Sequence, residues 1–303
     1  MASETATPLR LPVIDFSKKE LIPDSKEWES VKSQVCIALK EYGCFEALFN
    51  KVPAALRKDT VAVIEELFEL PMETKWRNTS EKPMHGYVGL TLISQSMDNL
   101  TNVLWPQGNP AFSKTIQSFS EQVSELDQIV RRMIVESLGL EKYMDEHMNS
   151  ATYLLRVMKY SSPQTTEEKV GLHPHTDKNF ITILCQNQVD GLQVKTKDGE
   201  WIDVKLSTDD SFAVMVGDSI FAWTNGLLRS ACHRVMMLGD KARYSAGLFS
   251  GPKSGYVIKA PDELIDEEHP LLFKPFVHSE FLKFYNTEAG LRAESALKIY
   301  CGV

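Results

Sequence analysis

Apolar side chains recur every three or four residues in three stretches of the N-terminal half, which is the spacing of one buried helix face. The first stretch begins where Asp24 and Glu27 have the spacing of a capping box, and it ends at Gly43. The second and third stretches cover residues 54–69 and 112–138. The pattern therefore predicts three amphipathic helices.

From Thr152 onward the pattern changes to short β-branched and aromatic runs, separated by turn signals such as Asp198-Gly199. Eight of these runs are predicted to be strands: Tyr153–Tyr160, Phe180–Gln186, Leu192–Lys195, Trp201–Lys205, Phe212–Val216, Ile220–Trp223, His233–Met237 and Arg243–Phe249. Such a set suits a jelly roll of two facing sheets. We therefore expect a mainly β fold with the N-terminal helices packed against it.

The domain organisation is predicted to be simple, because the chain has no repeat, low-complexity tract or linker-like break. We expect residues 1–303 to form a single globular unit. Within it, residues 11–110 are interpreted as a helical N-terminal part, residues 150–252 as the β core and residues 253–303 as a C-terminal extension.

Composition indicates a folded chain with a sizeable core, because 43% of the 303 residues are hydrophobic and 9% are aromatic. The net charge of −8 argues against nucleic acid or an anionic membrane surface as a partner. No stretch has the length and hydrophobicity of a membrane span or signal peptide. The 5 cysteines include no close pair and indicate reduced thiols in a cytoplasmic protein. We also expect the protein to be a monomer.

Candidate metal chemistry is concentrated in residues 172–177, which read Leu-His-Pro-His-Thr-Asp. On an extended backbone, His175 and Asp177 point to the same face. His233 is the best-placed third ligand because it opens a β-prone run. Two histidines and one carboxylate leave three adjacent positions open on an octahedral ion, which is how non-haem Fe(II) oxygenases bind a chelating co-substrate together with dioxygen.

A complementary anion site follows at Arg243 and Ser245, which share one face of a predicted strand. A planar guanidinium beside a hydroxyl suits a carboxylate, whose two oxygens both accept hydrogen bonds. A keto acid that chelates the metal at one end and pairs with Arg243 at the other is 2-oxoglutarate.

This arrangement resembles that of the plant iron(II)/2-oxoglutarate-dependent dioxygenases. The resemblance extends to Leu11–Phe16, Gly217-Asp218 and Trp223–Gly226, so it covers nearly the whole chain. It implies a distorted double-stranded β-helix, with Fe(II) as the metal, 2-oxoglutarate and O2 as co-substrates, and ascorbate as a supporting reductant. The implied reaction converts 2-oxoglutarate to succinate and CO2 while oxidising a substrate C–H bond, by default through hydroxylation.

Within this family, three stretches are similar to the branch that contains the alkenyl- and hydroxyalkyl-glucosinolate-producing dioxygenases and the steroidal glycoalkaloid dioxygenases. They are residues 41–47, 102–110 and 266–270. The resemblance therefore implies a small plant specialised metabolite as substrate, without naming one.

Two further residues receive roles from the resemblance. Tyr160 matches the tyrosine of an Asn-x-Tyr motif that contacts 2-oxoglutarate in relatives, although Met158 replaces the asparagine here. Phe249 matches an aromatic residue that packs on the substrate. On sequence alone, Phe249 fits a place in the β core equally well.

Other interpretations stay open. His173 forms His-x-His with His175, which permits a cupin-like metal-binding protein without enzymatic activity. The segment 87–104 is expected to be shorter than in close relatives, which permits a catalytically impaired paralogue that retains iron or 2-oxoglutarate binding. Asp218 is interpreted as a turn residue. Four more histidines are predicted to lie at the surface, and they are His85, His147, His269 and His278.

Overall fold

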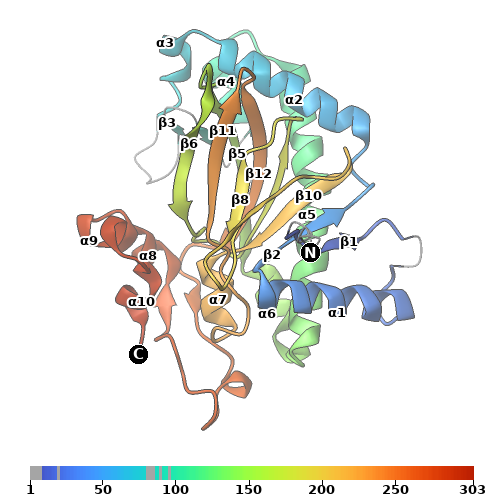
Figure 1. Cartoon of the computed structure of the whole chain (residues 1–303), viewed down its shortest axis with the longest axis vertical. Helices are drawn as coiled ribbons and strands as arrows, with labels where there is room; N and C mark the ends of the chain where they lie inside the picture. The colour runs from blue at the N-terminus through green and yellow to red at the C-terminus, as the bar shows by residue number, and fades with distance from the viewer. Residues whose placement is uncertain (1–8, 19–20, 80–85, 89–90, 95–96) are drawn as a thin grey trace, which may run out of the picture.

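Two stacked β-sheets form the centre of the molecule in a computed structural model, which describes residues 9–18, 21–79, 86–88, 91–94 and 97–303 (Figure 1). The larger sheet contains, in spatial order, β1 (Val13–Asp15), β2 (Cys44–Leu48), β10 (Ser211–Val216), β7 (Ile181–Gln186), β12 (Arg243–Pro252), β5 (Ala151–Tyr160), β4 (Thr91–Ser94) and β3 (Gly86–Val88). The smaller sheet contains β6 (Thr165–His175), β11 (His233–Gly239), β8 (Leu192–Lys195) and β9 (Trp201–Asp203). A separate pair joins β13 (Val257–Ile258) to β14 (Phe276–Val277).

The space between the two sheets holds a small apolar core. Met158, Leu184 and Met215 enter it from the larger sheet, and Val194 and Val235 enter it from the smaller one. Alternation along each strand sends every second side chain into this space. The inner faces of β5, β7 and β12 therefore supply the walls of any pocket between the sheets.

Three long helices cover the outer face of the larger sheet, and they are α1 (Lys26–Glu41), α2 (Ala54–Glu69) and α5 (Pro110–Ser137). Their apolar stripes join one large cluster with the sheet. This confirms the three predicted helices. The cap of α1 is a correction, because Ser25 and not Asp24 accepts the hydrogen bond from the Trp28 backbone N–H.

The strand predicted at Ile220–Trp223 is wrong, because these residues belong to the short helix α7 (Asp218–Trp223). The run is apolar throughout, and such a run does not distinguish a strand from a buried helix. Several strands were not predicted, and β6 is the longest of them; among the described strands it pairs with β11 alone and lies at the edge of its sheet. An edge strand keeps polar, exposed residues and tolerates Pro174, so its sequence is like that of a loop.

The remaining helices lie at the margins of the sheets. They are α3 (Met72–Lys75), α4 (Met97–Leu104), α6 (Met144–Asn149), α8 (His278–Tyr285), α9 (Glu288–Arg292), α10 (Ala296–Cys301) and the 3-10 turns Glu141–Tyr143 and Asp262–Leu264. The C-terminal helices α8 to α10 gather on one side, below β6 (Figure 1). Helices account for 39% of the structure, so the description as mainly β is too narrow. A β core buttressed by helices is the more accurate statement.

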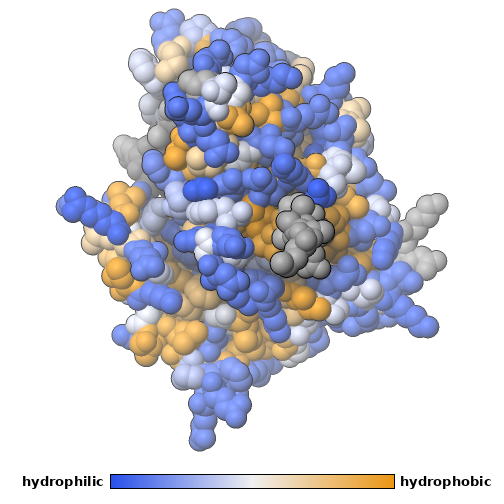
Figure 2. All heavy atoms as spheres, in the orientation of Figure 1, coloured by the Kyte–Doolittle hydropathy of each residue, from blue (hydrophilic) through white to orange (hydrophobic). Residues whose placement is uncertain are grey.

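The surface is largely hydrophilic on the face shown in Figure 2. Among the described residues, no helix is long and apolar enough to cross a membrane. All five cysteines are free.

Candidate active site

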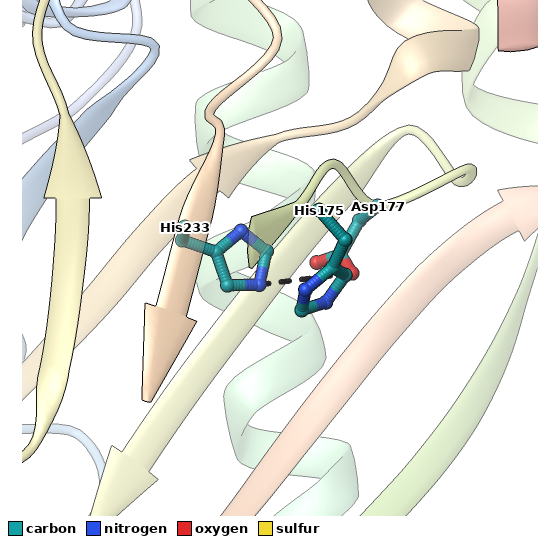
Figure 3. A group of neighbouring side chains, drawn as sticks. All are labelled: His175, Asp177 and His233. Carbon is teal, nitrogen blue, oxygen red and sulfur yellow. Dashed lines mark ion pairs between the residues drawn. The ribbon is translucent and has the colours of Figure 1, made fainter. Parts of the chain in front are cut away.

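The two predicted histidine ligands lie on neighbouring strands of the smaller sheet, where His175 ends β6 and is paired with His233 at the start of β11. Asp177 follows β6, and its Oδ1 atom is 3.7 Å from His175 Nε2 and 3.9 Å from His233 Nε2. The three side chains converge on one point, with their donor atoms within 4.8 Å of one another (Figure 3). One metal ion can bridge such separations with bonds of about 2.0–2.2 Å.

Both histidines present Nε2 to this point because the backbone holds their other ring nitrogen. His175 Nδ1 lies 2.8 Å from the carbonyl oxygen of His173, and His233 Nδ1 lies 3.0 Å from that of Ala231. A carbonyl oxygen only accepts, so Nδ1 carries the proton and Nε2 keeps its lone pair. Burial lowers the pKa of His175 to about 4, so this ring is neutral near pH 7 and able to bind a metal.

Hydrogen bonds within its own segment orient Asp177. Its Oδ2 atom accepts from the Thr182 hydroxyl at 2.6 Å, and Thr182 Oγ1 accepts from Asn179 Nδ2 at 3.1 Å. Oδ1 is thereby left for the metal. Burial favours the neutral acid, but His233, His175 and the Thr182 hydrogen bond outweigh it and lower the pKa of Asp177. The donor set, two imidazoles and one carboxylate, therefore fits Fe(II).

Asp218 is more than the turn residue predicted from Gly-Asp, because it connects the two segments that carry the ligands. Its Oδ2 atom accepts from Lys178 Nζ at 2.7 Å and from Thr176 Oγ1 at 3.1 Å, and its Oδ1 accepts from Ser230 Oγ at 2.7 Å. Thr176 and Lys178 flank the metal-binding carboxylate, while Ser230 precedes β11. The sequence feature that could have indicated this role of Asp218 is the presence of an acidic residue between two apolar runs.

Arg243 begins β12 and is fully buried, at 0% exposure. Its Nη2 donates to Gln186 Oε1 at 2.7 Å and its Nη1 to Ser245 Oγ at 3.4 Å, whereas its Nε has no hydrogen-bond partner. No carboxylate of a described residue lies within ion-pair distance of this guanidinium. A buried cation with an unused donor fits a ligand that brings its own carboxylate.

Tyr160 lies beside Arg243, with the guanidinium carbon 5.2 Å from the centre of its ring. Its hydroxyl donates to Met158 Sδ at 3.4 Å. Met158 thus engages the tyrosine hydroxyl. A thioether is a weak acceptor on a flexible chain, so a ligand carboxylate can displace it.

Phe249 is half-buried and lines the same pocket as His175, Asp177 and Arg243. Its ring covers Gly247, where an added Cβ would lie 2.9 Å from a ring carbon. The open space between the side chains is only about 20 Å³, close to the size of one water molecule.

The surface prediction is wrong for His147, which is only 1% exposed and packs against Trp223 at a ring separation of 4.5 Å. Its helix α6 has a polar sequence, so the residues around it gave no sign of burial. His278 is half-buried, with Nε2 3.0 Å from the Lys178 carbonyl oxygen, so it also differs from the prediction. His269 is exposed as predicted, whereas His85 lies outside the described residues.

His173 is exposed, and its backbone carbonyl oxygen is the atom that holds the His175 ring. Its ring is not part of the cluster of donor atoms formed by His175, Asp177 and His233. The geometry therefore favours the ligand set with one carboxylate over the cupin-like set with a third histidine.

The fold and the site define a metal-dependent oxygenase with a jelly-roll core. Comparisons with known proteins show the family of oxygenases to which the chain belongs. Residues 149–252 match the 2OG-Fe(II) oxygenase superfamily, and residues 11–105 match the N-terminal region of non-haem dioxygenases in morphine synthesis. The probable 2-oxoglutarate-dependent dioxygenase AOP1.2 of Arabidopsis thaliana is 53% identical over 96% of this chain and 95% of its own length. The chain therefore belongs to the 2-oxoglutarate-dependent dioxygenases, and the resemblance inferred from its sequence is confirmed.

Solved structures agree with this assignment. The dioxygenase for auxin oxidation from rice has a TM-score of 0.82 and 27% identity, covering 96% of this chain and 100% of its own. JOX2 in complex with 2OG, Fe and JA has a TM-score of 0.82 and 25% identity, covering 99% of this chain and 92% of its own. The chain is accordingly an enzyme of this class that uses Fe(II) and 2-oxoglutarate.

Proposed function

We propose that this enzyme oxidises a C–H bond of a small plant metabolite, by default through hydroxylation, in a pocket between the two sheets of a distorted double-stranded β-helix. One observation carries the proposal: the cluster of His175, Asp177 and His233 and the buried cation Arg243 line the same pocket. The structural neighbours support a small organic substrate, because one is a dioxygenase for auxin oxidation and another is in complex with JA.

In this proposal each residue has a distinct role. His175, Asp177 and His233 bind Fe(II), which supplies the oxygen activation when bound. Arg243 and Ser245 hold the distal carboxylate of 2-oxoglutarate, and the Tyr160 hydroxyl turns from Met158 to this carboxylate. The apolar side chains around the site limit the access of water and orient the substrate carbon.

Anaerobic titration tests the proposal directly. Fe(II) followed by 2-oxoglutarate should give a visible charge-transfer band, and admission of air with ascorbate should then give succinate. Zn(II) or Ni(II) should bind without turnover, because neither readily supports the redox steps. An Fe(II)-loaded protein that gives neither a band nor succinate would contradict the proposal.

A catalytically impaired paralogue is the second candidate. One relative, 34% identical over 97% of this chain, is the probable inactive 2-oxoglutarate-dependent dioxygenase AOP2 of A. thaliana. The shorter segment expected at 87–104 stays a prediction, and β4 within it pairs with β5 beside the pocket. A charge-transfer band without any succinate, with or without candidate substrates, would favour this candidate.

Phe249→Leu should weaken substrate oxidation while leaving uncoupled conversion of 2-oxoglutarate and thermal stability nearly unchanged. The reason is that Phe249 is half-buried and faces the pocket, whereas a core ring would be enclosed. The measurement compares succinate yield with product yield for a substrate of the native enzyme. Phe119→Leu is a matched control, because Phe119 is 1% exposed in the helix–sheet core and its truncation should lower thermal stability. Parallel behaviour of the two variants would place Phe249 in the core.

A further inference from the structure

Gln186, at the end of β7, accepts a short hydrogen bond from the buried guanidinium of Arg243. The distance from Arg243 Nη2 to Gln186 Oε1 is 2.7 Å. An arginine side chain only donates, so the amide must turn its oxygen toward Arg243 and its nitrogen away. Gln186 Nε2 accordingly faces Asp190 Oδ1 at 3.4 Å. Each end of the amide therefore has a complementary partner, which fixes its orientation.

The segment that carries Gln186 also holds the backbone and the side-chain stem of Arg243. Asn187 N donates to the Tyr244 carbonyl oxygen at 2.9 Å, and Asn187 Oδ1 accepts from Tyr244 N at 3.1 Å. At Gly191 the segment approaches so closely that an added Cβ would lie 3.5 Å from Arg243 Cδ. Gln186 and the guanidinium are thus held against each other by contacts on both sides of their hydrogen bond.

Gln186 orients the guanidinium without neutralising it, because an amide carries no net charge. The carboxylate of Asp190 stands behind the amide and is separated from Arg243 by the length of that group. Burial lowers the pKa of Arg243, because nearby groups, Tyr160 and Asp190 first among them, do not fully offset the desolvation. A guanidinium stays protonated even so, and its charge remains available to a ligand.

We propose that Gln186 is a positioning residue that sets the preference for a keto acid with a second, distal carboxylate. Its amide oxygen holds Arg243 so that Nε, which has no hydrogen-bond partner among the described residues, is left for that carboxylate. A carboxylate at position 186 would instead bind the guanidinium itself and compete with the ligand. This inference rests on the proposed function, because it requires Arg243 to bind 2-oxoglutarate.

Two keto acids of equal chain length test the role of Gln186. In 2-oxopentanoate a methyl group replaces the distal carboxylate of 2-oxoglutarate. Each is titrated anaerobically into the Fe(II)-loaded enzyme, and the charge-transfer band gives its Kd. Gln186→Glu should weaken 2-oxoglutarate binding roughly tenfold or more, because an opposite charge within about 4–6 Å changes an ionic equilibrium by about one to three powers of ten. The Kd of 2-oxopentanoate should stay nearly unchanged.

A charge exchange controls for the added negative charge. Gln186→Glu combined with Asp190→Asn keeps the net charge and allows the same hydrogen bond with its direction reversed. This double variant should show the same selective loss of 2-oxoglutarate binding. Gln188→Glu adds the same charge at an exposed residue of the same segment and should keep the native preference, as should Asp190→Asn alone.

Fe(II) affinity, measured by equilibrium dialysis, is the second readout. It should be native in every variant, because Gln186 is not part of the cluster of His175, Asp177 and His233. Weaker Fe(II) binding in Gln186→Glu, or an equal loss of both keto acids, would make Gln186 a general support of the fold and overturn the inference.

The remaining outcomes separate this inference from the proposed function. Absence of the charge-transfer band in the native enzyme with Fe(II) and 2-oxoglutarate would remove the proposed function itself. A normal band, with the native preference retained in Gln186→Glu and in the double variant, would overturn only the role of Gln186. A native enzyme that binds both keto acids equally would overturn it as well.

Discussion

Asp177→Ala should abolish turnover and weaken Fe(II) binding by more than roughly a hundredfold, since loss of an outer-shell partner alone costs about ten- to a hundredfold. The Asp177 carboxylate is the only oxygen ligand among these three residues, and Thr182 and Asn179 hold it in place. Alanine leaves two imidazoles on adjacent strands, which do not complete the facial arrangement of the metal site. Equilibrium dialysis of Fe(II) under anaerobic conditions and succinate formation are the measurements.

Asp203→Ala is a suitable control, because Asp203 is exposed on β9 and accepts a hydrogen bond from Gln193 at 2.8 Å. This variant should bind Fe(II) and form succinate like the native enzyme. Circular dichroism should show that both variants are folded. Full activity of Asp177→Ala protein after metal reconstitution would refute the ligand assignment.

The metal ligands were predictable from the sequence because their chemistry depends on local spacing. His175 and Asp177 are two residues apart, and the strand that begins at His233 has a clear β pattern. Arg243 and Ser245 were predictable for the same reason, since alternation along β12 puts them on one face. These inferences needed only the residue period within a short segment, whereas the pairing of His175 with His233 across β6 and β11 came from the structure.

The residues that position the site were missed because they act across the chain. Asp218 joins Thr176 to Ser230, and His278 reaches the carbonyl oxygen of Lys178 from the C-terminal helices. Such contacts follow from the packing of distant segments, which residue spacing does not encode. The burial of His147 was missed for the same reason.

For the fold as well, elements set by local sequence were predicted, whereas elements set by long-range packing were not. Residues 54–69 form a helix as predicted, because a long amphipathic stripe determines both the element and its buried face. Strand β6 was missed since an edge strand carries polar residues, and part of α7 was mistaken for a strand since its residues 220–223 are all apolar. Where the tertiary position of a segment determines its composition, the hydrophobic period of that segment no longer predicts whether it is a helix or a strand.

Arg243→Leu should raise the apparent requirement for 2-oxoglutarate roughly thirtyfold or more while leaving Fe(II) binding largely intact. Removing one partner of a buried, hydrogen-bonded charge pair costs ~2–5 kcal/mol, and about 1.4 kcal/mol corresponds to a factor of ten. Arg243 is fully buried and, among the described residues, its Nε has no hydrogen-bond partner, which fits the proposed pairing with a ligand carboxylate. Titration of 2-oxoglutarate against the charge-transfer band measures the effect.

Arg243→Leu also leaves Gln186 Oε1 without its donor, so a weaker binding of 2-oxoglutarate could come from the fold. A second ligand shows whether Arg243 binds the distal carboxylate or only supports the fold. Pyruvate chelates a metal through the same keto acid group but lacks the distal carboxylate. The native enzyme should strongly prefer 2-oxoglutarate to pyruvate, whereas Arg243→Leu should bind the two about equally. Arg234→Leu is the control, since Arg234 lies over Trp201 at 4.1 Å on the smaller sheet and should keep the preference. An unchanged preference in Arg243→Leu would make Arg243 a structural cation.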